Sequence, residues 1–386
     1  MSKIYDTIYE GTFLRRPNRF VVEFLLAGKT VRAHLPNPGR MWELLFPGVT
    51  LYAVYTGGFG KKTDYRIIGI ERDGVPISLD TNYSNDVAAY LIDRQQIPGW
   101  ERWQVLQREY TVGQSRFDLL LGCGEERFLL EVKSCTLFSR TGAMFPDAIT
   151  ERGKKHILHL AALADTGTYR AGVLFLVQWE RAQWFLPDYH TDIEFAKAFY
   201  GVESRLDWKA VAVRWAANFA MPTVIRTLPY KPAVLEEEAH DCGDYLLVLH
   251  VEADADIEVG AKGLIHFPKG YYIYVGSAKK NMDKRIARHG RLRKQFHWHI
   301  DYLRQLSVLV AALPIRTAAD LEHILAAAVK KVTAWEIRGF GCTDCRCTSH
   351  LFGMDNNPIH DEGVMQVVED FRMNRLDGLI KKAEPL

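Results

Sequence analysis

Short apolar runs alternate with turn residues over the first part of the chain. Gly- and Pro-containing segments at residues 27–29, 36–39 and 57–60 break the pattern. Between them lie four runs with the length and composition of β-strands, at residues 19–26, 30–35, 50–55 and 65–71. Closely spaced short strands of this kind predict a small β-barrel in residues 1–82.

The next segment, residues 83–221, mixes helical and strand periodicities. Helix patterns cover residues 86–96 and 150–164, and Thr150 is positioned to cap the second helix. Strand patterns lie between and after them, at residues 103–112, 115–121, 127–133, 170–179 and 209–215. Strands interleaved with helices predict a mixed sheet covered by helices.

A change of composition marks residues 222–241. Pro222, Pro229 and Pro232 precede an acidic run at 236–238, a pattern typical of an extended linker. Apolar strands then begin a further domain, residues 242–386, at 245–251 and 271–278. The expected fold is therefore a multidomain protein of the α+β and α/β classes.

Composition agrees with several domains and restricts the cellular setting. The chain has 386 residues, 48% of them hydrophobic, which is enough for two or three cores. Lys and Arg number 49 against 47 acidic residues, so any nucleic-acid contact must come from local patches. Six cysteines are too few for a disulfide scaffold, and no apolar run approaches the roughly 20 residues that cross a bilayer. We expect a reduced, cytoplasmic protein without membrane contact.

Candidate chemistry is densest in the predicted hairpin 115–133. Asp118, Glu131 and Lys133 are charged residues within two apolar strands, and Lys133 shares a strand face with Glu131. Alternating charges usually mark only a solvated face. An unpaired carboxylate inside an apolar strand is costly, however, whereas two carboxylates can hold Mg²⁺ or Mn²⁺. We therefore predict that Asp118 and Glu131 bind a divalent metal and that Lys133 positions water or stabilises the transition state.

Three motifs in this region resemble a known family. They read SRFD at residues 115–118, EVKS at 131–134 and FPDAITERGKKH at 145–156. They are similar to the sugar fermentation stimulation protein family, whose core resembles the PD-(D/E)XK nucleases. HLPNPGR at 34–40 matches another signature of that family. The resemblance implies an OB-like barrel, a PD-(D/E)XK nuclease-like domain, and Asp147, Glu151 and Arg152 at the edge of the site.

Nucleic-acid contacts are expected from basic residues beside aromatic rings. In the predicted barrel these are Arg16, Arg19 and Arg40, near Phe20 and Trp42. Arginines on a half-buried sheet are as often only a solvated face. On the helix 150–164, Lys154 and Lys155 are further candidates for a phosphate contact, although surface lysines are common on amphipathic helices.

A second nuclease-like signature occurs in the C-terminal domain. YVGSA at residues 274–278 and KRIARH at 284–289 are similar to the GIY-YIG nucleases, and FHWHIDY at 296–302 resembles a Uri-type branch of them. The resemblance implies Tyr274, Arg285 and His289 as catalytic residues and Glu322 as a metal ligand. Where that family has Gly-Ile-Tyr, this chain has DYL at 244–246, which makes Tyr245 the candidate second tyrosine.

Cations crowd the segment that follows the second signature. Eight of them, against the single acid Asp283, favour a polyanion partner, with Lys284 and Arg288 as candidate contacts. Next to them, His297, His299 and Asp301 alternate as on one face of a strand. They are candidates for metal binding or acid–base catalysis, and a structural histidine pair is the alternative.

Cysteines cluster near the end of the chain. Cys342, Cys345, Cys347 and His350 form a candidate zinc site. Because four ligands from one loop would strain the backbone, His299 or Cys242 is an alternative ligand. Reduced thiols that only pack or react are the other interpretation.

The sequence as a whole predicts a nucleic-acid-binding protein and a nuclease that hydrolyses phosphodiester bonds. The expected cofactor is Mg²⁺ or Mn²⁺, with Zn²⁺ as a further candidate, and DNA is favoured over RNA as the partner. The alternative suggested by the family name is a non-catalytic DNA-binding regulator of sugar-metabolism genes. In a third hypothesis, the C-terminal domain only recruits a partner.

Overall fold

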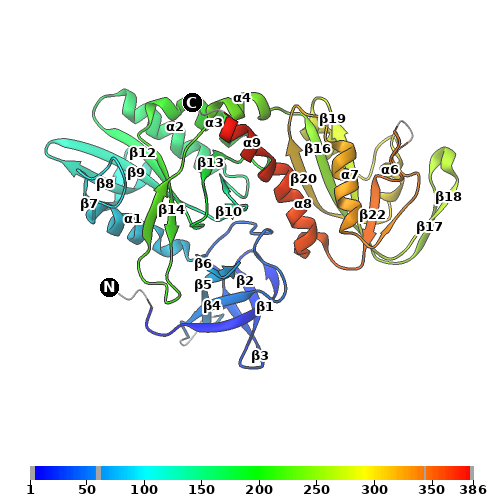
Figure 1. Cartoon of the computed structure of the whole chain (residues 1–386), viewed down its shortest axis with the longest axis horizontal. Coiled ribbons are helices and arrows are strands. Elements are labelled where there is room, and N and C mark those ends of the chain that lie inside the picture. Colours follow the sequence, from blue (N-terminus) through cyan, green and yellow to red (C-terminus); the bar gives the residue numbers. More distant parts are fainter. Residues whose placement is uncertain (1–4, 58–61, 343–344, 383–386) are drawn as a thin grey trace. The chain divides into compact units, whose positions relative to one another are not determined.

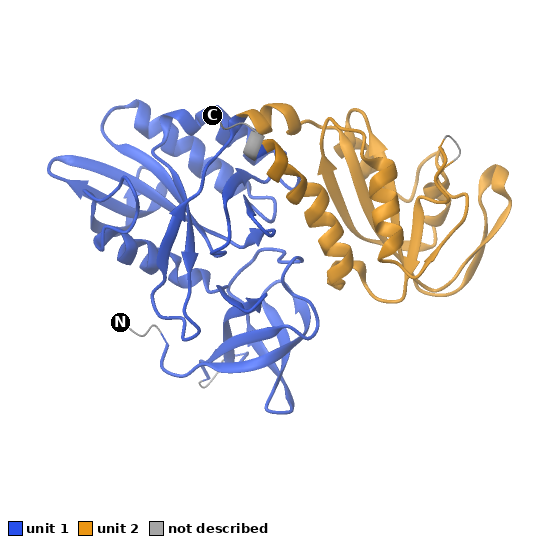
Figure 2. Ribbon diagram, in the orientation of Figure 1, with its two compact units in different colours: residues 1–232, 380–386 blue, residues 233–379 orange. Residues whose placement is uncertain are grey.

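The computed structural model describes residues 5–57, 62–342 and 345–382. The chain forms two compact units, shown in different colours in Figure 2. The first comprises residues 1–232 with 380–386, and the second comprises residues 233–379.

The first unit begins with a closed barrel (Figure 1). Its strands run in the order β3-β2-β1-β4-β5-β6, and β3 also pairs with β5, which closes the sheet on itself. Apolar residues such as Phe13, Phe24 and Ile67 fill the interior. The strands are β1 (Tyr9–Asn18), β2 (Val21–Leu26), β3 (Lys29–His34), β4 (Thr50–Tyr55), β5 (Tyr65–Arg72) and β6 (Val75–Ser78). The barrel confirms the predicted OB-like fold, although β1 was not predicted from the sequence.

A mixed six-stranded sheet forms the rest of this unit, in the order β15-β14-β12-β9-β8-β7. Strand β12 is parallel to both β9 and β14, and the other neighbours are antiparallel. The strands are β7 (Gln104–Val112), β8 (Ser115–Cys123), β9 (Glu126–Cys135), β12 (Arg170–Val177), β14 (Lys209–Arg214) and β15 (Thr223–Thr227). A smaller sheet joins β10 (Leu137–Phe138), β11 (Gly142–Phe145) and β13 (Trp184–Pro187).

Helices cover both faces of the mixed sheet. Helix α1 (Ser84–Asp93) packs with Leu130 in one core cluster, whereas α2 (Glu151–Asp165) packs with Leu129 in another. Neighbouring residues of β9 thus face opposite helices, as the period of two requires. Thr150 caps α2 as predicted, because its hydroxyl accepts a hydrogen bond from the Gly153 amide at 3.0 Å. Helix α3 (Ile193–Val202), which was not predicted, packs against α2.

The second unit is built on an antiparallel sheet in the order β20-β16-β19-β22-β21. Its strands are β16 (Gly243–Val251), β19 (Gly270–Ala278), β20 (Ser307–Arg316), β21 (Trp335–Glu336) and β22 (Leu351–Met354), and a separate hairpin joins β17 (Ala255–Glu258) to β18 (Leu264–Phe267). The helices in this part of the chain are α4 (Pro232–Glu238), α5 (Met282–Gly290), α6 (His299–Leu303), α7 (Glu322–Lys331), α8 (Glu362–Arg372) and α9 (Asp377–Lys382).

Two sequence predictions are wrong. Residues 222–241 are not an extended linker, because β15 joins the sheet of the first unit and α4 forms a helix. The predicted strand at 297–301 is the start of helix α6, because Asp301 caps the amides of His297 and Trp298. Among the described residues, no helix is both long and apolar enough to cross a membrane.

Candidate functional site

The hairpin of β8 and β9 brings Asp118 next to Glu131. Leu119 pairs with Leu130, so the two carboxylates occupy the next position of the ladder. One Asp118 oxygen, Oδ2, accepts a hydrogen bond from the Val132 amide at 2.8 Å, and Oδ1 accepts one from Asn85 Nδ2 at 2.9 Å. The sequence prediction that Asp118, Glu131 and Lys133 come together agrees with these contacts.

Glu131 has one engaged and one available oxygen. Its Oε1 lies 2.6 Å from Lys133 Nζ and 2.8 Å from His156 Nδ1. The residue is only 4% exposed, and its Oε2 is buried without a hydrogen-bond partner among the described residues. A buried carboxylate oxygen without a partner is costly, which makes Oε2 a fitting ligand for a cation.

The two carboxyl groups differ in their electrostatics. Burial, and then the charge of Glu131, raises the pKa of Asp118 above its usual value. Burial would also raise the pKa of Glu131, but the hydrogen bond with His156 and the charge of Lys133 outweigh it and lower that pKa. Glu131 is therefore ionised at neutral pH, whereas Asp118 would gain from a positive charge placed beside it.

These side chains line a cleft of about 530 Å³ between the barrel and the mixed sheet. Asp147 and Arg152, two of the residues expected at the edge of the site, also line it, and burial raises the pKa of Asp147. The barrel contributes one exposed cation, Arg19, and the loop Asn37, Pro38 and Gly39. The cleft is thus lined by both polar and apolar side chains and is bordered by both parts of the first unit.

The predicted nucleic-acid contacts of this unit have different surroundings. Arg16 donates to the backbone oxygens of Gly39 and Arg40 at 2.8 and 2.7 Å, so it holds the loop beside the cleft rather than facing solvent. The Arg40 guanidinium lies over the Trp42 ring at 4.9 Å. Lys154 forms an ion pair with Glu194 at 3.0 Å. Arg19 is the predicted contact that borders the cleft.

Sequence reasoning assigned no role to His156 or Asn85. His156 comes from α2 and Asn85 from α1, so each of these two helices supplies one partner of a carboxylate. His156 is the last residue of the motif at 145–156 and lies on a helix that was predicted to cover the sheet. These two features could have indicated its role. Asn85 directly precedes the predicted helix 86–96 and had no comparable signal.

The second unit holds a smaller cleft, of about 340 Å³. Tyr245 from β16 and Tyr274 from β19 line it together with Arg285 from α5 and Glu322 from α7. The two tyrosines lie on paired strands, with Tyr245 opposite Gly276. The structure therefore brings together Tyr274, Arg285 and Glu322, and it gives Tyr245 a place beside them.

Glu322 and Arg285 are held by the surrounding strand and helix. Glu322 Oε2 accepts a hydrogen bond from the Ser277 hydroxyl at 2.9 Å, and Arg285 donates to the Ser277 carbonyl. The Arg285 guanidinium also lies over the Trp298 ring at 4.9 Å. At the position where this chain departs from the Gly-Ile-Tyr motif, burial and the charge of Glu322 raise the pKa of Asp244 to about 7.

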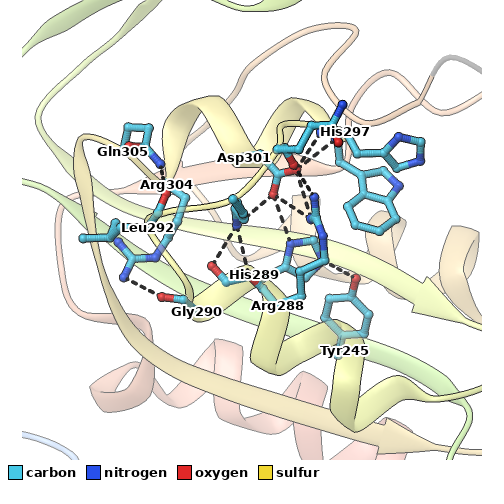
Figure 3. A network of polar contacts seen from close by, with 12 residues as sticks. Tyr245, Arg288, His289, Gly290, Leu292, His297, Asp301, Arg304 and Gln305 are labelled. Carbon is cyan, nitrogen blue, oxygen red and sulfur yellow. Dashed lines mark hydrogen bonds and ion pairs between the residues drawn. The ribbon is translucent and has the colours of Figure 1, made fainter.

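Asp301 is the centre of a polar network (Figure 3), and it accepts hydrogen bonds from the amides of His297 and Trp298, two residues that line this cleft. Its buried carboxylate forms ion pairs with Arg288 at 3.0 Å and Lys294 at 2.8 Å. His289 Nδ1 lies 3.7 Å from Asp301, and its Nε2 lies 3.0 Å from the Tyr245 hydroxyl. Burial lowers the pKa of His289. His289 and Arg288, predicted as a catalytic residue and a nucleic-acid contact, thus belong to the network around Asp301 and contact the lining residues Tyr245 and Trp298.

The basic segment retains part of the predicted positive patch. Arg285, Arg288 and Lys294 have partners inside the unit. The remaining cations of the segment are exposed: Lys279, Lys280, Lys284, Arg291 and Arg293.

The cysteine-rich loop forms a cluster with a different membership from the predicted one. The ligand atoms of His323, Cys345, Cys347 and His350 all lie within 4.8 Å of one another. His323, from α7, takes the position expected for Cys342. The alternatives have other contacts, because His299 Nδ1 accepts from the Gly341 amide at 3.2 Å and Cys242 donates to the Thr317 carbonyl at 3.4 Å.

Comparison with known proteins shows which family this chain resembles. Models of the sugar fermentation stimulation protein N-terminal OB domain and RE domain match residues 14–79 and 82–217. A sugar fermentation stimulation protein homolog of Methanothermobacter thermautotrophicus is 36% identical over 198 residues, 51% of this chain and 82% of that protein. The chain belongs to the sugar fermentation stimulation protein family. A homolog from Chloroflexus aurantiacus is 38% identical over 191 residues, 50% of this chain and 73% of that protein.

The family relationship extends to a solved structure. The structure of Pyrococcus furiosus SfsA in complex with Ca²⁺ covers 60% of this chain and 99% of its own, with 27% identity and a TM-score of 0.55. Residues 244–373 match a separate model, described as domain of unknown function DUF123. The sugar fermentation stimulation protein domains of this chain are therefore joined to a DUF123 domain.

Proposed function

We propose that this member of the sugar fermentation stimulation protein family binds nucleic acid and hydrolyses phosphodiester bonds with a divalent metal. The reacting site is Asp118, Glu131 and Lys133. The observation that carries the proposal is the buried Oε2 of Glu131, which has no hydrogen-bond partner among the described residues and lies beside a second carboxylate. Two adjacent carboxylates with a spare oxygen match what Mg²⁺ or Mn²⁺ requires.

A cation bound there would lower the pKa of a water and offset charge that develops on the phosphate. The chain supplies the rest of the chemistry. Asn85 and the Val132 amide orient Asp118, and His156 orients Glu131. Lys133 Nζ lies 2.6 Å from Glu131 Oε1, its side chain is 18% exposed, and the residue borders the cleft. Its ammonium is placed to stabilise negative charge on a bound phosphate.

The barrel is the proposed nucleic-acid-binding domain, residues 1–82, and residues 83–221 are the proposed PD-(D/E)XK nuclease-like domain. Arg19 and the loop held by Arg16 border the same cleft as the carboxylates. A strand that contacts the barrel would therefore pass the reacting site. The structure of the Pyrococcus furiosus relative was solved in complex with Ca²⁺, a hard cation that prefers oxygen ligands. This complex supports the binding of a divalent metal by the carboxylates of this chain.

The DUF123 domain, residues 242–386 in the sequence-based division, is proposed as a second metal-dependent site of the GIY-YIG type. Tyr245, Tyr274 and Arg285 converge on one cleft with Glu322, whose carboxylate is the proposed metal ligand. In this arrangement Arg285 would bind a phosphate oxygen. The exposed cations of the basic segment, Lys284 among them, would add contacts to the nucleic-acid backbone.

The test is cleavage of labelled single- and double-stranded DNA and RNA in Mg²⁺, Mn²⁺ or chelator. We expect metal-dependent cleavage that Glu131→Gln and Lys133→Met each lower by at least about 100-fold, because they remove a cation ligand and a charge-stabilising group. Glu126→Gln is the matched control, since Glu126 lies on the same strand in an exposed ion pair with Arg102.

Each outcome assigns the activity. If Arg285→Ala abolishes cleavage and Glu131→Gln does not, the DUF123 site is the working one and the proposal for the first site is wrong. If the protein binds the polymers but cuts none of them with any metal, the nuclease proposal fails. The non-catalytic DNA-binding regulator then becomes the better explanation.

A further inference from the structure

The DUF123 domain contains a group of soft metal ligands that the proposed nuclease chemistry does not use. Cys345, Cys347 and His350 come from the segment between β21 and β22, and His323 comes from the first turn of α7. Cys347 Sγ lies 3.4 Å from His323 Nδ1, and Cys345 Sγ lies 3.5 Å from His350 Nε2. The cluster thus consists of two sulfur–nitrogen pairs, Cys347 with His323 and Cys345 with His350.

These spacings match the edges of a zinc tetrahedron. Zinc binds cysteine sulfur at about 2.3 Å and histidine nitrogen at about 2.0–2.1 Å, so adjacent sulfur and nitrogen ligands lie about 3.6 Å apart. The observed separations of 3.4 and 3.5 Å agree with that edge. Two thiolates with two imidazoles favour zinc over Mg²⁺, which prefers oxygen ligands.

His350 also connects this cluster to the neighbouring cleft. It is 2% exposed, its Nε2 faces Cys345, and its Nδ1 lies 3.4 Å from Glu322 Oε1. A histidine that binds metal through one nitrogen commonly directs the other toward a carboxylate, which fixes the ring orientation. Glu322 is in that position, and it begins the same helix that supplies His323.

We propose that His323, Cys345, Cys347 and His350 bind one structural Zn²⁺. Four protein ligands fill the tetrahedron and leave no open position, so the ion has a structural rather than a catalytic role. Zinc would join the cysteine-containing segment to α7 and orient His350 against Glu322. The proposal stands independently of the nuclease activity proposed above.

The first experiment measures zinc in the purified full-length protein by elemental analysis, after dialysis against a zinc-free buffer. We expect one zinc per chain in the wild type and in Cys342→Ser, the control from the same loop. Cys345→Ser, Cys347→Ser and His323→Asn should lose it. Zinc bound by His323→Asn but not by Cys342→Ser would overturn the proposed ligand set, and a zinc-free wild type that does not take up added zinc would overturn the site.

Cobalt substitution provides a measurement that does not depend on loss of metal. The Co²⁺ protein should show the visible bands of a tetrahedral ion and a charge-transfer band from two thiolates. His323→Cys should keep the metal and raise the charge-transfer intensity by about half, because three thiolates replace two. An unchanged intensity in His323→Cys would show that residue 323 is not a ligand and would refute the proposal.

Discussion

Asp301→Asn should strongly destabilise the second unit. The substitution keeps the shape of the side chain but removes its charge. The Asp301 carboxylate is fully buried and forms ion pairs with Arg288 at 3.0 Å and Lys294 at 2.8 Å. It also accepts hydrogen bonds from the backbone amides of His297 and Trp298. The Lys294 side chain is itself only 6% exposed. In the variant, Lys294 would therefore remain as a buried charge without its counterion.

The size of the effect follows from this burial. Removing one partner of a buried ion pair typically costs about 3–5 kcal/mol, because an uncompensated charge remains. For a unit of this size, each kcal/mol lowers Tm by about 2–4 °C, so Asp301→Asn should lower the Tm of the second unit by about 6–20 °C. Differential scanning calorimetry of the full chain measures this shift.

Asp256→Asn is the matched control. Asp256 belongs to the same unit and lies 2.8 Å from His266, but the side chains of Asp256 and His266 are 60% and 59% exposed. An exposed pair contributes only about 0–1 kcal/mol, so this control should change Tm little. The reasoning is refuted if Asp301→Asn lowers Tm no more than Asp256→Asn does.

The pH dependence gives an independent check with a defined sign. Burial alone would raise the pKa of Asp301, but the nearby His289 and Lys294 and the hydrogen bonds from two backbone amides lower it far below its usual range. A carboxyl group whose pKa is depressed by folding stabilises the fold above its unfolded pKa of about 3.9, and this stability is lost as the pH falls. The difference in Tm between wild type and Asp301→Asn should therefore be full at pH 7 and shrink below about pH 5.

Two further predictions concern the first unit. Because folding raises the pKa of Asp118, its ionised form opposes folding, and the penalty grows as the pH rises through the folded pKa. In chelator, the Tm of Asp118→Asn relative to the wild type should therefore increase as the pH rises to 8, and the variant should lack the stabilisation by Mn²⁺ that we expect of the wild type; a difference in Tm that does not change with pH would contradict this view. Arg16→Ala should lower the stability of this unit by about 1–3 kcal/mol in chemical denaturation, because four backbone oxygens lose their donor. Arg19→Ala, the control, should weaken nucleic-acid binding but leave stability unchanged. Equal losses of stability in the two variants would show that Arg16 has no special structural role.

Local periodicity was sufficient to predict the first candidate site. Asp118, Glu131 and Lys133 lie on adjacent strands of one hairpin, so alternation and a short turn fix their proximity. His156 and Asn85 were missed because they are 25 and 33 positions from their partners and come from separate helices. How α1 and α2 dock on the sheet depends on packing between distant apolar residues, which the spacing of charges does not encode.

The cysteine cluster shows the same limit in another form. Cys342, Cys345 and Cys347 are close in sequence, and this proximity suggested that one loop supplies all the ligands. The cluster instead takes its fourth member, His323, from α7, 24 positions from Cys347. Joining a loop to a helix avoids the strain expected of four ligands in one short segment, and the residue that joins the cluster is His323 rather than His299 or Cys242.

Charge density along a sequence also differs from charge presented by a fold. The run of eight cations after β19 predicted a continuous phosphate-binding surface, yet Asp301 lies only seven positions beyond Lys294 and pairs with two of them. The alternation of residues 297–301 hid this acid, because it suggested a strand, whereas the acid caps a helix. The basic segment thus has two roles, since some cations stabilise the domain around Asp301 and others remain exposed. Substitutions of Lys284 or Arg291 therefore test nucleic-acid binding, whereas substitutions of Arg288 or Lys294 would first change the stability of the domain.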